Sequence, residues 1–390
     1  MKQPVNSVAC LIVTLCATVA SVPLASAQGA PLQATSTPNA YVYVINRVSG
    51  GNSQLDGYNA DSNGALTPLP GSPFWTFTAS VQYWALAHTS NWLFASDANN
   101  IYSFSIASNG TLTQRSSINV EQYANSDEVV SLFLDHTGST LYANEENVGE
   151  GTQGNSILAF QKNSTTGALT YLSSNADYPD RRGEGQGDQA ASLLSFTGNN
   201  EYAYNAGCDQ SVPSWYAVRR NNDGTLTRVL IDPTIPSNPS GSYCPFGSAA
   251  DPTNHLAVAL FLGQSGPTQL AVYTADSSGN LTTNSTDANM PTTAVSVPNA
   301  LSVSPAGNLL AVAGTNGLQV FYFNGGNPIT PYTGRLAWRE TYDLGWDKHN
   351  HLYSIGSGAV QAWRITTTGW KQALGSPYPM NPLALTVLSK

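Results

Sequence analysis

Charged side chains are scarce in this sequence. Only 10% of the 390 residues are Asp, Glu, Lys or Arg, and 15 basic residues face 24 acidic ones, so the formal net charge is −9. Nucleic acids and anionic membrane surfaces are bound through clustered Lys and Arg. The lack of basic residues therefore argues against both as partners.

Long apolar runs are missing as well, apart from one near the N-terminus. An apolar run over residues 8–22 follows Lys2 and leads into Ala25-Ser26-Ala27. This order is typical of a secretory signal with its cleavage pattern, and the run is too short to predict a membrane span. We expect a signal peptide over residues 1–27, a polar lead-in over residues 28–40, and a protein that is secreted or periplasmic.

Cysteine is almost absent. Two of the four cysteines, Cys10 and Cys16, leave with the leader, which leaves Cys208 and Cys244 in the mature chain. In an oxidising compartment an even pair is expected to be bridged. Closing a loop of this length stabilises a fold by about 4 kcal/mol on the chain-entropy model.

Glycine and proline, by contrast, are plentiful, with 34 and 23 residues. Between residues 129 and 172 they and Asn, Asp and Ser separate four apolar runs of four to six residues each. Runs this short predict strands, and Asp135-His136-Thr137-Gly138 has the composition of a type I turn. Four strands in sequence predict an antiparallel meander.

The meander recurs along the chain, marked by a Gly-x-Leu-Thr motif. The motif begins at Gly64, Gly110, Gly167, Gly224 and Gly279, at spacings of 46 to 57 residues, and degenerate copies follow near Gly326 and Gly369. Seven copies of a four-stranded unit predict an all-β fold, a seven-bladed β-propeller over residues 41–390.

The two ends of the chain are expected to share one blade. Residues 41–46 match the second strand of the unit, and residues 382–388 form an apolar run left over after the seventh unit. Pairing these two segments would close the ring and remove an open sheet edge. The other innermost strands are expected at residues 83–87, 130–134, 191–194, 247–250, 299–303 and 342–346.

Loop lengths distinguish the two faces of the predicted ring. Turns from the first to the second strand and from the third to the fourth are short, whereas the other connections are long in the middle of the chain. Long loops on a rigid scaffold often carry function. We expect a ligand face on the loops of the third to fifth blades, where Cys208 and Cys244 also lie.

The segment Leu301-Ser302-Val303-Ser304-Pro305-Ala306-Gly307-Asn308-Leu309-Leu310-Ala311-Val312 resembles the repeat of lactonase-type seven-bladed propellers. That family includes 6-phosphogluconolactonases and fungal muconate-lactonizing enzymes, so the resemblance implies the propeller fold and a lactone-opening activity. The motifs specify the blade and leave the chemistry open.

One departure from the family bears on activity. Lactonase-type propellers often carry Pro-His where the inner strands begin. The matching positions here are Gln82, Val130, Ala190, Phe246, Asn299 and Tyr342, and none is histidine. A general base contributes about a hundred- to ten-thousand-fold to such hydrolysis, and these positions do not supply one.

The most polar cluster on the expected ligand face consists of Arg181, Arg182, Glu184 and Asp188. An arginine pair can hold a carboxylate or phosphate in bidentate fashion, and a neighbouring carboxylate can act as a base. These four are the candidate catalytic residues; the alternative is a solvated loop whose charges pair with one another.

Aromatic side chains in the same loops are candidate ligand contacts. They are Trp75, Tyr123, Tyr178, Tyr243 and Phe246. Flat rings with polar neighbours suit sugars or protein interfaces. The alternative is packing between blades.

No metal or cofactor is predicted. The five histidines, His88, His136, His255, His349 and His351, fall in short turns and are expected to be solvated. Acidic residues gather in the third blade at Asp127, Glu128, Glu145, Glu146 and Glu150. Calcium binding there stays an alternative, although the spacing matches no known calcium loop.

Two functions stay open from the sequence. The first is a monomeric scaffold that binds a small molecule, a carbohydrate or an extracellular protein on the long loops. The second is a hydrolase acting on a sugar-derived or related lactone.

Overall fold

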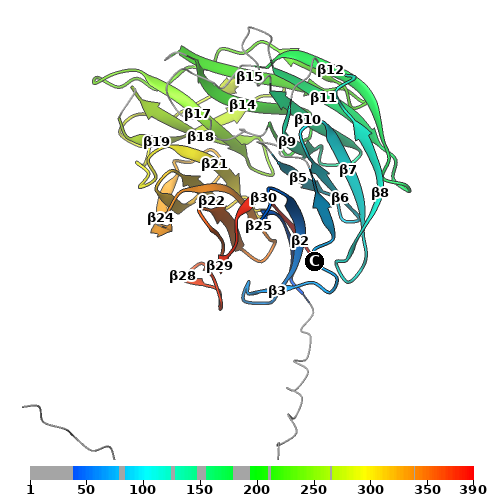
Figure 1. Cartoon of the computed structure of the whole chain (residues 1–390). Helices are drawn as coiled ribbons and strands as arrows, with labels where there is room; N and C mark the ends of the chain where they lie inside the picture. Colours follow the sequence, from blue (N-terminus) through cyan, green and yellow to red (C-terminus); the bar gives the residue numbers. More distant parts are fainter. Residues whose placement is uncertain are drawn as a thin grey trace, which may run out of the picture. The chain divides into compact units, whose positions relative to one another are not determined.

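The computed structural model describes residues 38–78, 84–123, 128–146, 155–178, 194–209, 212–263, 266–337 and 339–390. Within these ranges every regular element is a strand, so they hold no helix that could span a membrane. The strands form seven antiparallel sheets, the blades of a β-propeller (Figure 1). The predicted fold class and blade number are therefore confirmed.

Each blade has four main strands, numbered here from the channel outward. Blade 1 holds β30 (Pro382–Ser389), β1 (Ala40–Arg47), β2 (Ser53–Ala60) and β3 (Leu66–Pro68), and β4 (Trp75–Phe77) also pairs with β2. Blade 2 holds β5 (Ala85–His88), β6 (Trp92–Ser96), β7 (Asn100–Ile106) and β8 (Leu112–Asn119). Blade 3 holds β9 (Glu128–Leu134), β10 (Thr140–Glu146), β11 (Asn155–Lys162) and β12 (Leu169–Tyr178).

The remaining blades follow the same order. Blade 4 holds β13 (Ser195–Phe196), β14 (Tyr202–Asp209), β15 (Val212–Arg220) and β16 (Leu226–Val229). Blade 5 holds β17 (Tyr243–Ala250), β18 (His255–Leu262), β19 (Thr268–Ala275) and β20 (Leu281–Thr282). Blade 6 holds β21 (Pro298–Val303), β22 (Leu309–Gly314), β23 (Gly317–Tyr322) and β24 (Thr330–Ala337). Blade 7 holds β25 (Thr341–Trp346), β26 (His351–Gly356), β27 (Ala359–Thr366) and β28 (Gly369–Gln372), and β29 (Tyr378–Pro379) also pairs with β27.

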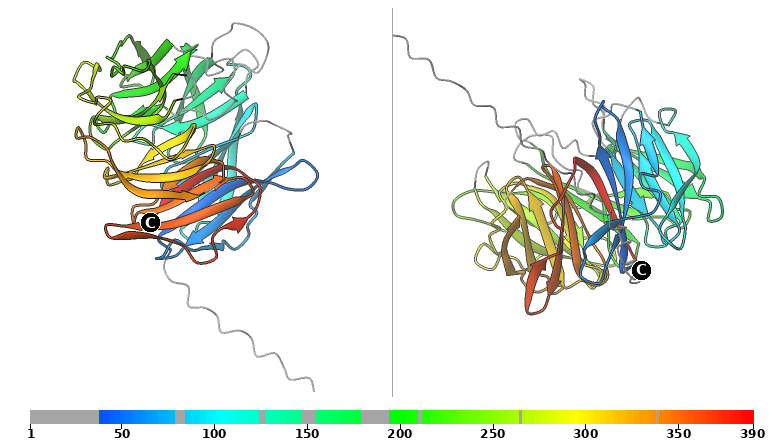
Figure 2. Two further views of the ribbon diagram at one scale, coloured as in Figure 1. Left: turned by 90° about the vertical axis from the view of Figure 1, so that its left-hand side faces the viewer. Right: turned by 60° about the horizontal axis from the view of Figure 1, so that its bottom comes forward.

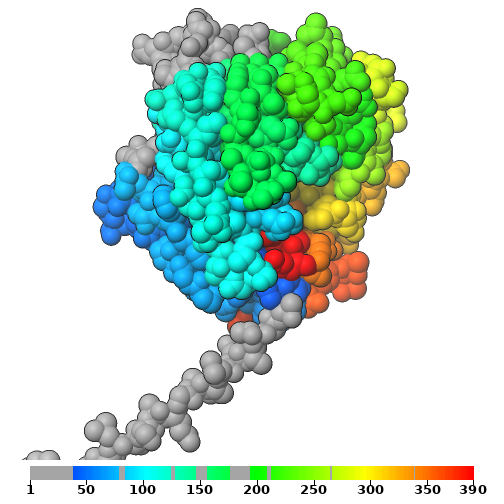
Figure 3. All heavy atoms as spheres, turned by 90° about the vertical axis from the view of Figure 1, so that its right-hand side faces the viewer, coloured from blue at the N-terminus to red at the C-terminus, as the bar shows by residue number. Residues whose placement is uncertain are grey.

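The ring closes as predicted, because β30 pairs antiparallel with β1. Tyr41 lies opposite Leu388, and Ile45 lies opposite Ala384. In Figure 2 the red closing strand lies between the blue strands of blade 1 and the orange strands of blade 7. Figure 3 shows the same junction from outside, with red C-terminal atoms against blue and orange ones. The closing strand therefore joins the first and last blades.

The Gly-x-Leu-Thr motif joins each of several blades to the one before it. Gly110 has φ +84°, and its carbonyl accepts a 2.8 Å hydrogen bond from the hydroxyl of Tyr43 in blade 1. A Cβ on Gly110 would lie 2.7 Å from the ring of Tyr41. The same contact recurs from Tyr142 to the carbonyl of Gly224, at 2.7 Å. The motif thus needs glycine both for its backbone conformation and for the close approach of the next blade.

The two faces of the ring differ in their connections. We call the side that carries the first-to-second and third-to-fourth turns the short-turn face, and the opposite side the long-loop face. Apolar side chains between neighbouring blades form the core, which includes Tyr43, Phe94 and Tyr204. The long-loop face is where the chain enters each inner strand, so it also surrounds one mouth of the central channel.

Candidate functional site at the channel mouth

The inner strands of five blades share an irregularity just inside the long-loop face. Their pairing with the second strand is interrupted by a β-bulge, which leaves one extra residue on the inner strand. The extra residues are Val130, Phe246, Asn299, Tyr342 and Leu383; in blade 5 the shift includes Gly247. A bulge re-aims its side chain and is often found beside active sites. We call these five residues the bulge ring.

The bulge ring coincides with positions where the family resemblance predicts histidine. Val130, Phe246, Asn299 and Tyr342 are positions where lactonase-type propellers often carry histidine, and Leu383 is the equivalent on the closing strand. Gln82 and Ala190 lie outside the described residues. Four of the side chains are half-buried and Asn299 is 4% exposed. In place of imidazoles, the mouth therefore carries apolar and aromatic groups and one buried carboxamide.

Asn299 carries the unusual polar group of this ring. Its Nδ2 donates to the carbonyl of Thr341 in blade 7 at 3.0 Å. Its Oδ1 is buried and has no hydrogen-bond partner in the described part of the chain. An unsatisfied buried acceptor costs about 1–3 kcal/mol. A bound hydroxyl or amine would remove this cost.

Two cavities open on the long-loop face. The first, about 230 Å³, lies where blade 7 meets blade 1 and is lined by residues 356–358, residues 381–383, Arg47 and Tyr342. The second, about 260 Å³, lies between blades 5 and 6 and is lined by Phe261, residues 266–268 and residues 293–296. The first cavity includes two members of the bulge ring, so it belongs to the channel mouth.

A carboxyl group lies one residue deeper on β25. The Oδ1 of Asp343 accepts the Leu344 N–H at 2.7 Å, and its Oδ2 accepts the Leu385 N–H of the closing strand at 3.3 Å. Loss of hydration raises the pKa of Asp343 to about 6, and the two N–H groups only partly offset it. This carboxyl therefore titrates near neutral pH, although no sequence motif marks it.

His88 contacts the closing strand from its other side. Its Nδ1 lies 2.7 Å from the hydroxyl oxygen of Thr386. Burial lowers the pKa of His88 to about 4, because the imidazolium form is poorly hydrated there. At neutral pH the ring is uncharged, so His88 can donate or accept a hydrogen bond with Thr386 and places no positive charge beside the closing strand.

The predicted disulfide is present and lies beside the bulge ring. Cys208 on β14 is bonded to Cys244 on β17, with 5.5 Å between their Cα atoms. Cys244 is two residues before Phe246. The bridge therefore ties blade 4 to the inner strand of blade 5 and braces the mouth at this point.

The predicted ligand aromatics lie in different surroundings. Phe246 is at the channel mouth, whereas Tyr243 is buried, with its hydroxyl bonded to Gln269 and, at 2.6 Å, to Asp287. Trp75 packs edge-on against Phe104 in the core between blades 1 and 2.

The other two predicted aromatics are in blades 2 and 3. Tyr123 is stacked on Tyr171, with 4.2 Å between ring centroids. The side chain of Tyr178 lies outside the described part. Of the described predicted aromatics, Phe246 alone belongs to the bulge ring, and a ligand role for the set stays a prediction.

The predicted catalytic cluster, Arg181, Arg182, Glu184 and Asp188, lies outside the described residues, as do Asp127 and Glu150. Glu145 is fully buried and Glu128 is half-buried on the neighbouring strand. Glu146 is in β10, but its side chain is outside the described part. No three His, Cys, Asp or Glu side chains within the described ranges are grouped to hold a metal ion.

The expectation that all five histidines are solvated is wrong for His351. Its side chain is 1% exposed, and its Nδ1 lies 2.7 Å from the buried carboxylate of Asp347. The motif glycine of blade 1, Gly64, packs over the ring, which explains the burial. His136 and His349 are exposed as expected, and His88 and His255 are half-buried.

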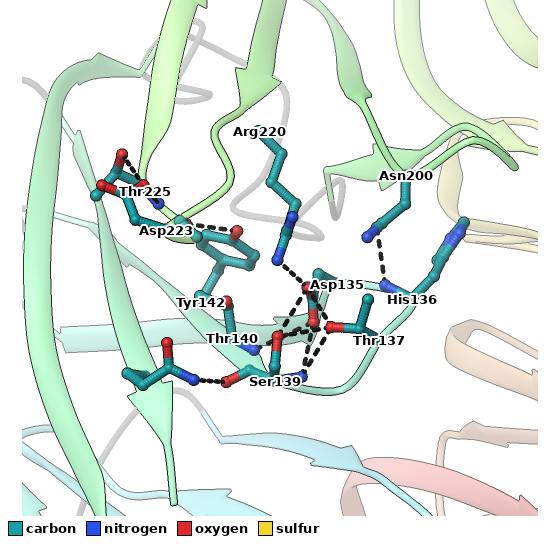
Figure 4. A network of polar contacts seen from close by, with 12 residues as sticks. Asp135, His136, Thr137, Ser139, Thr140, Tyr142, Asn200, Arg220, Asp223 and Thr225 are labelled. Carbon is teal, nitrogen blue, oxygen red and sulfur yellow. Dashed lines mark hydrogen bonds and ion pairs between the residues drawn. The ribbon is translucent and has the colours of Figure 1, made fainter.

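The short-turn face carries a dense polar network between blades 3 and 4 (Figure 4). The Oδ2 of Asp135 lies 2.7 Å from Arg220 on β15, and its Oδ1 accepts the N–H groups of Ser139 and Thr140 at 2.9 and 3.1 Å. Asp135 has no exposed side-chain surface. Both its oxygens are used within the fold, so the network fixes two blades together on the face opposite the bulge ring.

Comparisons with known proteins bear on the fold. No protein-family model matches the chain, and no curated protein matches it. Solved structures do: a Lactobacillus plantarum protein has a TM-score of 0.62 at 15% identity, covering 90% of this chain and 99% of that one.

Two further structures have the same coverage, 90% of this chain and 99% of theirs. A putative 6-phosphogluconolactonase from Bacteroides uniformis and a functionally unknown protein from Desulfotomaculum acetoxidans both have a TM-score of 0.59 at 12% identity. At such low identity the likeness shows the fold alone. The fold is the seven-bladed propeller that the sequence resemblance implies.

Proposed function

We propose that this chain is an exported ligand-binding propeller whose ligand lies at the channel mouth on the long-loop face. The observation that carries the proposal is the unpartnered, buried Oδ1 of Asn299 within the bulge ring. Buried polar groups in folded proteins are nearly always satisfied, so this oxygen, on the inner strand beside the channel mouth, is a candidate ligand contact.

The chemistry of the mouth favours a small ligand with hydroxyl groups and an apolar face. Phe246 and Tyr342 supply aromatic surface, and Asn299 supplies an acceptor. Aromatic faces beside a few placed polar groups suit carbohydrates. The Cys208–Cys244 bridge agrees with an oxidising, secreted or periplasmic setting.

Direct binding tests the proposal. The mature chain, from Gln28, is assayed against an array of mono- and oligosaccharides, and hits are measured by calorimetry. Asn299→Ala and Phe246→Ala should each weaken binding at least tenfold. Asn63→Ala, an exposed position on the short-turn face, should leave it unchanged. Equal affinity of all variants, or binding of an extracellular protein and no saccharide, would refute a carbohydrate ligand at this mouth.

A lactone hydrolase is the second candidate, and Asp343 favours it. A general base works best when its pKa lies near the working pH, and burial raises the pKa of Asp343 to about 6. The likeness to a putative 6-phosphogluconolactonase agrees with this at the level of the fold. Turnover of sugar lactones that is lost in Asp343→Asn or Glu184→Gln would establish it. An inactive wild-type protein on the whole lactone panel would rule it out.

A further inference from the structure

The cavity where blade 7 meets blade 1 contains one charged side chain, Arg47. Tyr342, Ser357 and Asn381 supply its other polar side chains, and Pro382 and Leu383 supply apolar wall. Arg47 is exposed and takes part in no ion pair of the described residues. Its guanidinium is therefore available to an anion.

Ring closure positions Arg47. Its backbone N–H donates to the carbonyl of Asn381 at 2.8 Å, and the Oδ1 of Asn46 accepts the Asn381 N–H at 2.8 Å. These two bonds fix the end of β1 against the segment that enters β30. The cavity is thus built from both ends of the chain and the turn between β26 and β27.

The far wall of the cavity offers hydroxyl groups and open space. The hydroxyl oxygens of Tyr342 and Ser357 are 3.1 Å apart. A Cβ built on Gly358 would meet no atom within 4 Å. A ligand can therefore approach this turn closely, with its hydroxyls toward Tyr342 and Ser357.

We infer that this cavity binds the carboxylate of a small hydroxy acid, such as a uronic acid, through Arg47. A guanidinium matches a carboxylate with two parallel hydrogen bonds. One positive charge suits a monoanion, and the volume of about 230 Å³, below the roughly 300–1,000 Å³ of sites for drug-sized ligands, suits a ligand of one sugar ring. The inference rests on the proposed function, because it assigns the ligand class of the same channel mouth.

The test compares charged and neutral probes of the same shape. D-glucuronate and D-galacturonate are titrated by calorimetry beside their methyl esters and D-glucose. The acids should bind at least tenfold more tightly than the esters. Arg47→Gln should abolish that difference, and Arg115→Gln, a change of an exposed arginine on β8, should preserve it.

A second variant, Tyr342→Phe, distinguishes loss of the carboxylate site from misfolding of the protein. Tyr342→Phe keeps the ring and removes one hydroxyl, so it should weaken the acids and the esters alike while keeping the preference for the acid. Equal binding of acid and ester, with Asn299→Ala still weakening both, would overturn the carboxylate site and leave the proposed function standing. No binding of any probe, acid or neutral, would overturn both.

Discussion

Asp343 is destabilising at neutral pH because burial raises its pKa to about 6, above its value near 4 in an unfolded chain. The native state binds the proton of this carboxyl more tightly than the unfolded chain does. The contribution of the protonated carboxyl to stability is therefore fully present below about pH 4 and is lost as the pH rises through 6. Asp343→Asn removes the charge and keeps one acceptor oxygen, for the closer Leu344 N–H at 2.7 Å, while it gives up the 3.3 Å bond from the Leu385 N–H. We expect it to raise the free energy of unfolding at pH 7 by about 1–3 kcal/mol.

Urea unfolding of both proteins at pH 4.5, 5.5 and 7 measures this effect. The increase in the free energy of unfolding caused by Asp343→Asn should shrink as the pH falls. Glu121→Gln, which changes an exposed carboxylate, should not increase the free energy of unfolding at any of these pH values. A variant that is less stable than wild type at pH 7 would show that the charge of Asp343 helps the fold.

The effect of His88 on stability changes with pH in the opposite direction. Its pKa falls from 6.5 to about 4, so its contribution is fully present above pH 6.5 and is lost as the pH falls through 4. His88→Gln can keep the hydrogen bond to Thr386 and cannot take up a proton. Between pH 6.5 and 4 the wild type should therefore lose about 1–3 kcal/mol more than the variant.

The control for this prediction is His349→Gln, because His349 is exposed in a turn. Its unfolding free energy should follow the wild-type pH dependence. If His88→Gln followed the same curve, His88 would be hydrated in the channel and its low pKa would be excluded.

These residue properties could be predicted from the sequence only in part. The positions of the bulge ring follow from strand register, which the repeat specifies. The environments of Asp343, His88 and His351 arise from contacts across blades, such as Asp343 with Leu385, 42 positions away. No local pattern records such contacts, so the histidine at 351 was expected to be solvated.

The motif glycines act at the scale of the blade. Gly110→Ala would place a Cβ against the Tyr41 ring and force a left-handed conformation on alanine. We expect a loss of about 2–4 kcal/mol, from backbone strain of about 1–2 kcal/mol and from overpacking. Thermal and urea unfolding measure it.

Gly334→Ala is the matched control. Gly334 lies on β24, and an added Cβ there would meet no atom within 4 Å. Its stability should change by less than about 0.5 kcal/mol. If Gly110→Ala cost no more than Gly334→Ala, neither the left-handed conformation nor the contact with blade 1 would require glycine at position 110.

At the scale of elements, the sequence predicts the positions of strands well where short apolar runs alternate with turns. Six of the predicted inner segments overlap inner strands of the structure, from β5 to β30. The prediction for residues 191–194 is not tested, because residues 191–193 lie outside the described part of the chain; β13 covers Ser195–Phe196. The extra strands β4 and β29 were not predicted, since each pairs only two or three residues after a proline-rich turn.

At the scale of the molecule, the closing strand links stability to the candidate site. β30 contributes Leu383 to the bulge ring, Leu385 and Thr386 to the contacts of Asp343 and His88, and Pro382 to the cavity beside Arg47. A ligand bound at this mouth would therefore contact the segment that completes the ring, and its binding energy would add to the stability of the closed state.

Removal of residues 382–390 should accordingly open the ring. Ala384, Leu385, Val387 and Leu388 are buried, and burying each larger side chain contributes about 1.5–3 kcal/mol. The truncated chain also exposes the edge of β1, and an unpaired strand edge can pair with another chain and cause aggregation. We expect a loss of at least about 5 kcal/mol, measured by thermal unfolding, with dimers or larger species in gel filtration.

Two controls separate closure from a general effect of shortening the chain. Removal of Lys390 alone, which takes away its contact with the Tyr41 ring and its bond to Asn39, should cost far less. A synthetic peptide of residues 381–390 should raise the melting temperature of the truncated protein, and a peptide of scrambled order should not. If the truncated protein melted with the full chain, the first blade would be stable without β30, and a site built on the closing strand could not be coupled to closure of the ring.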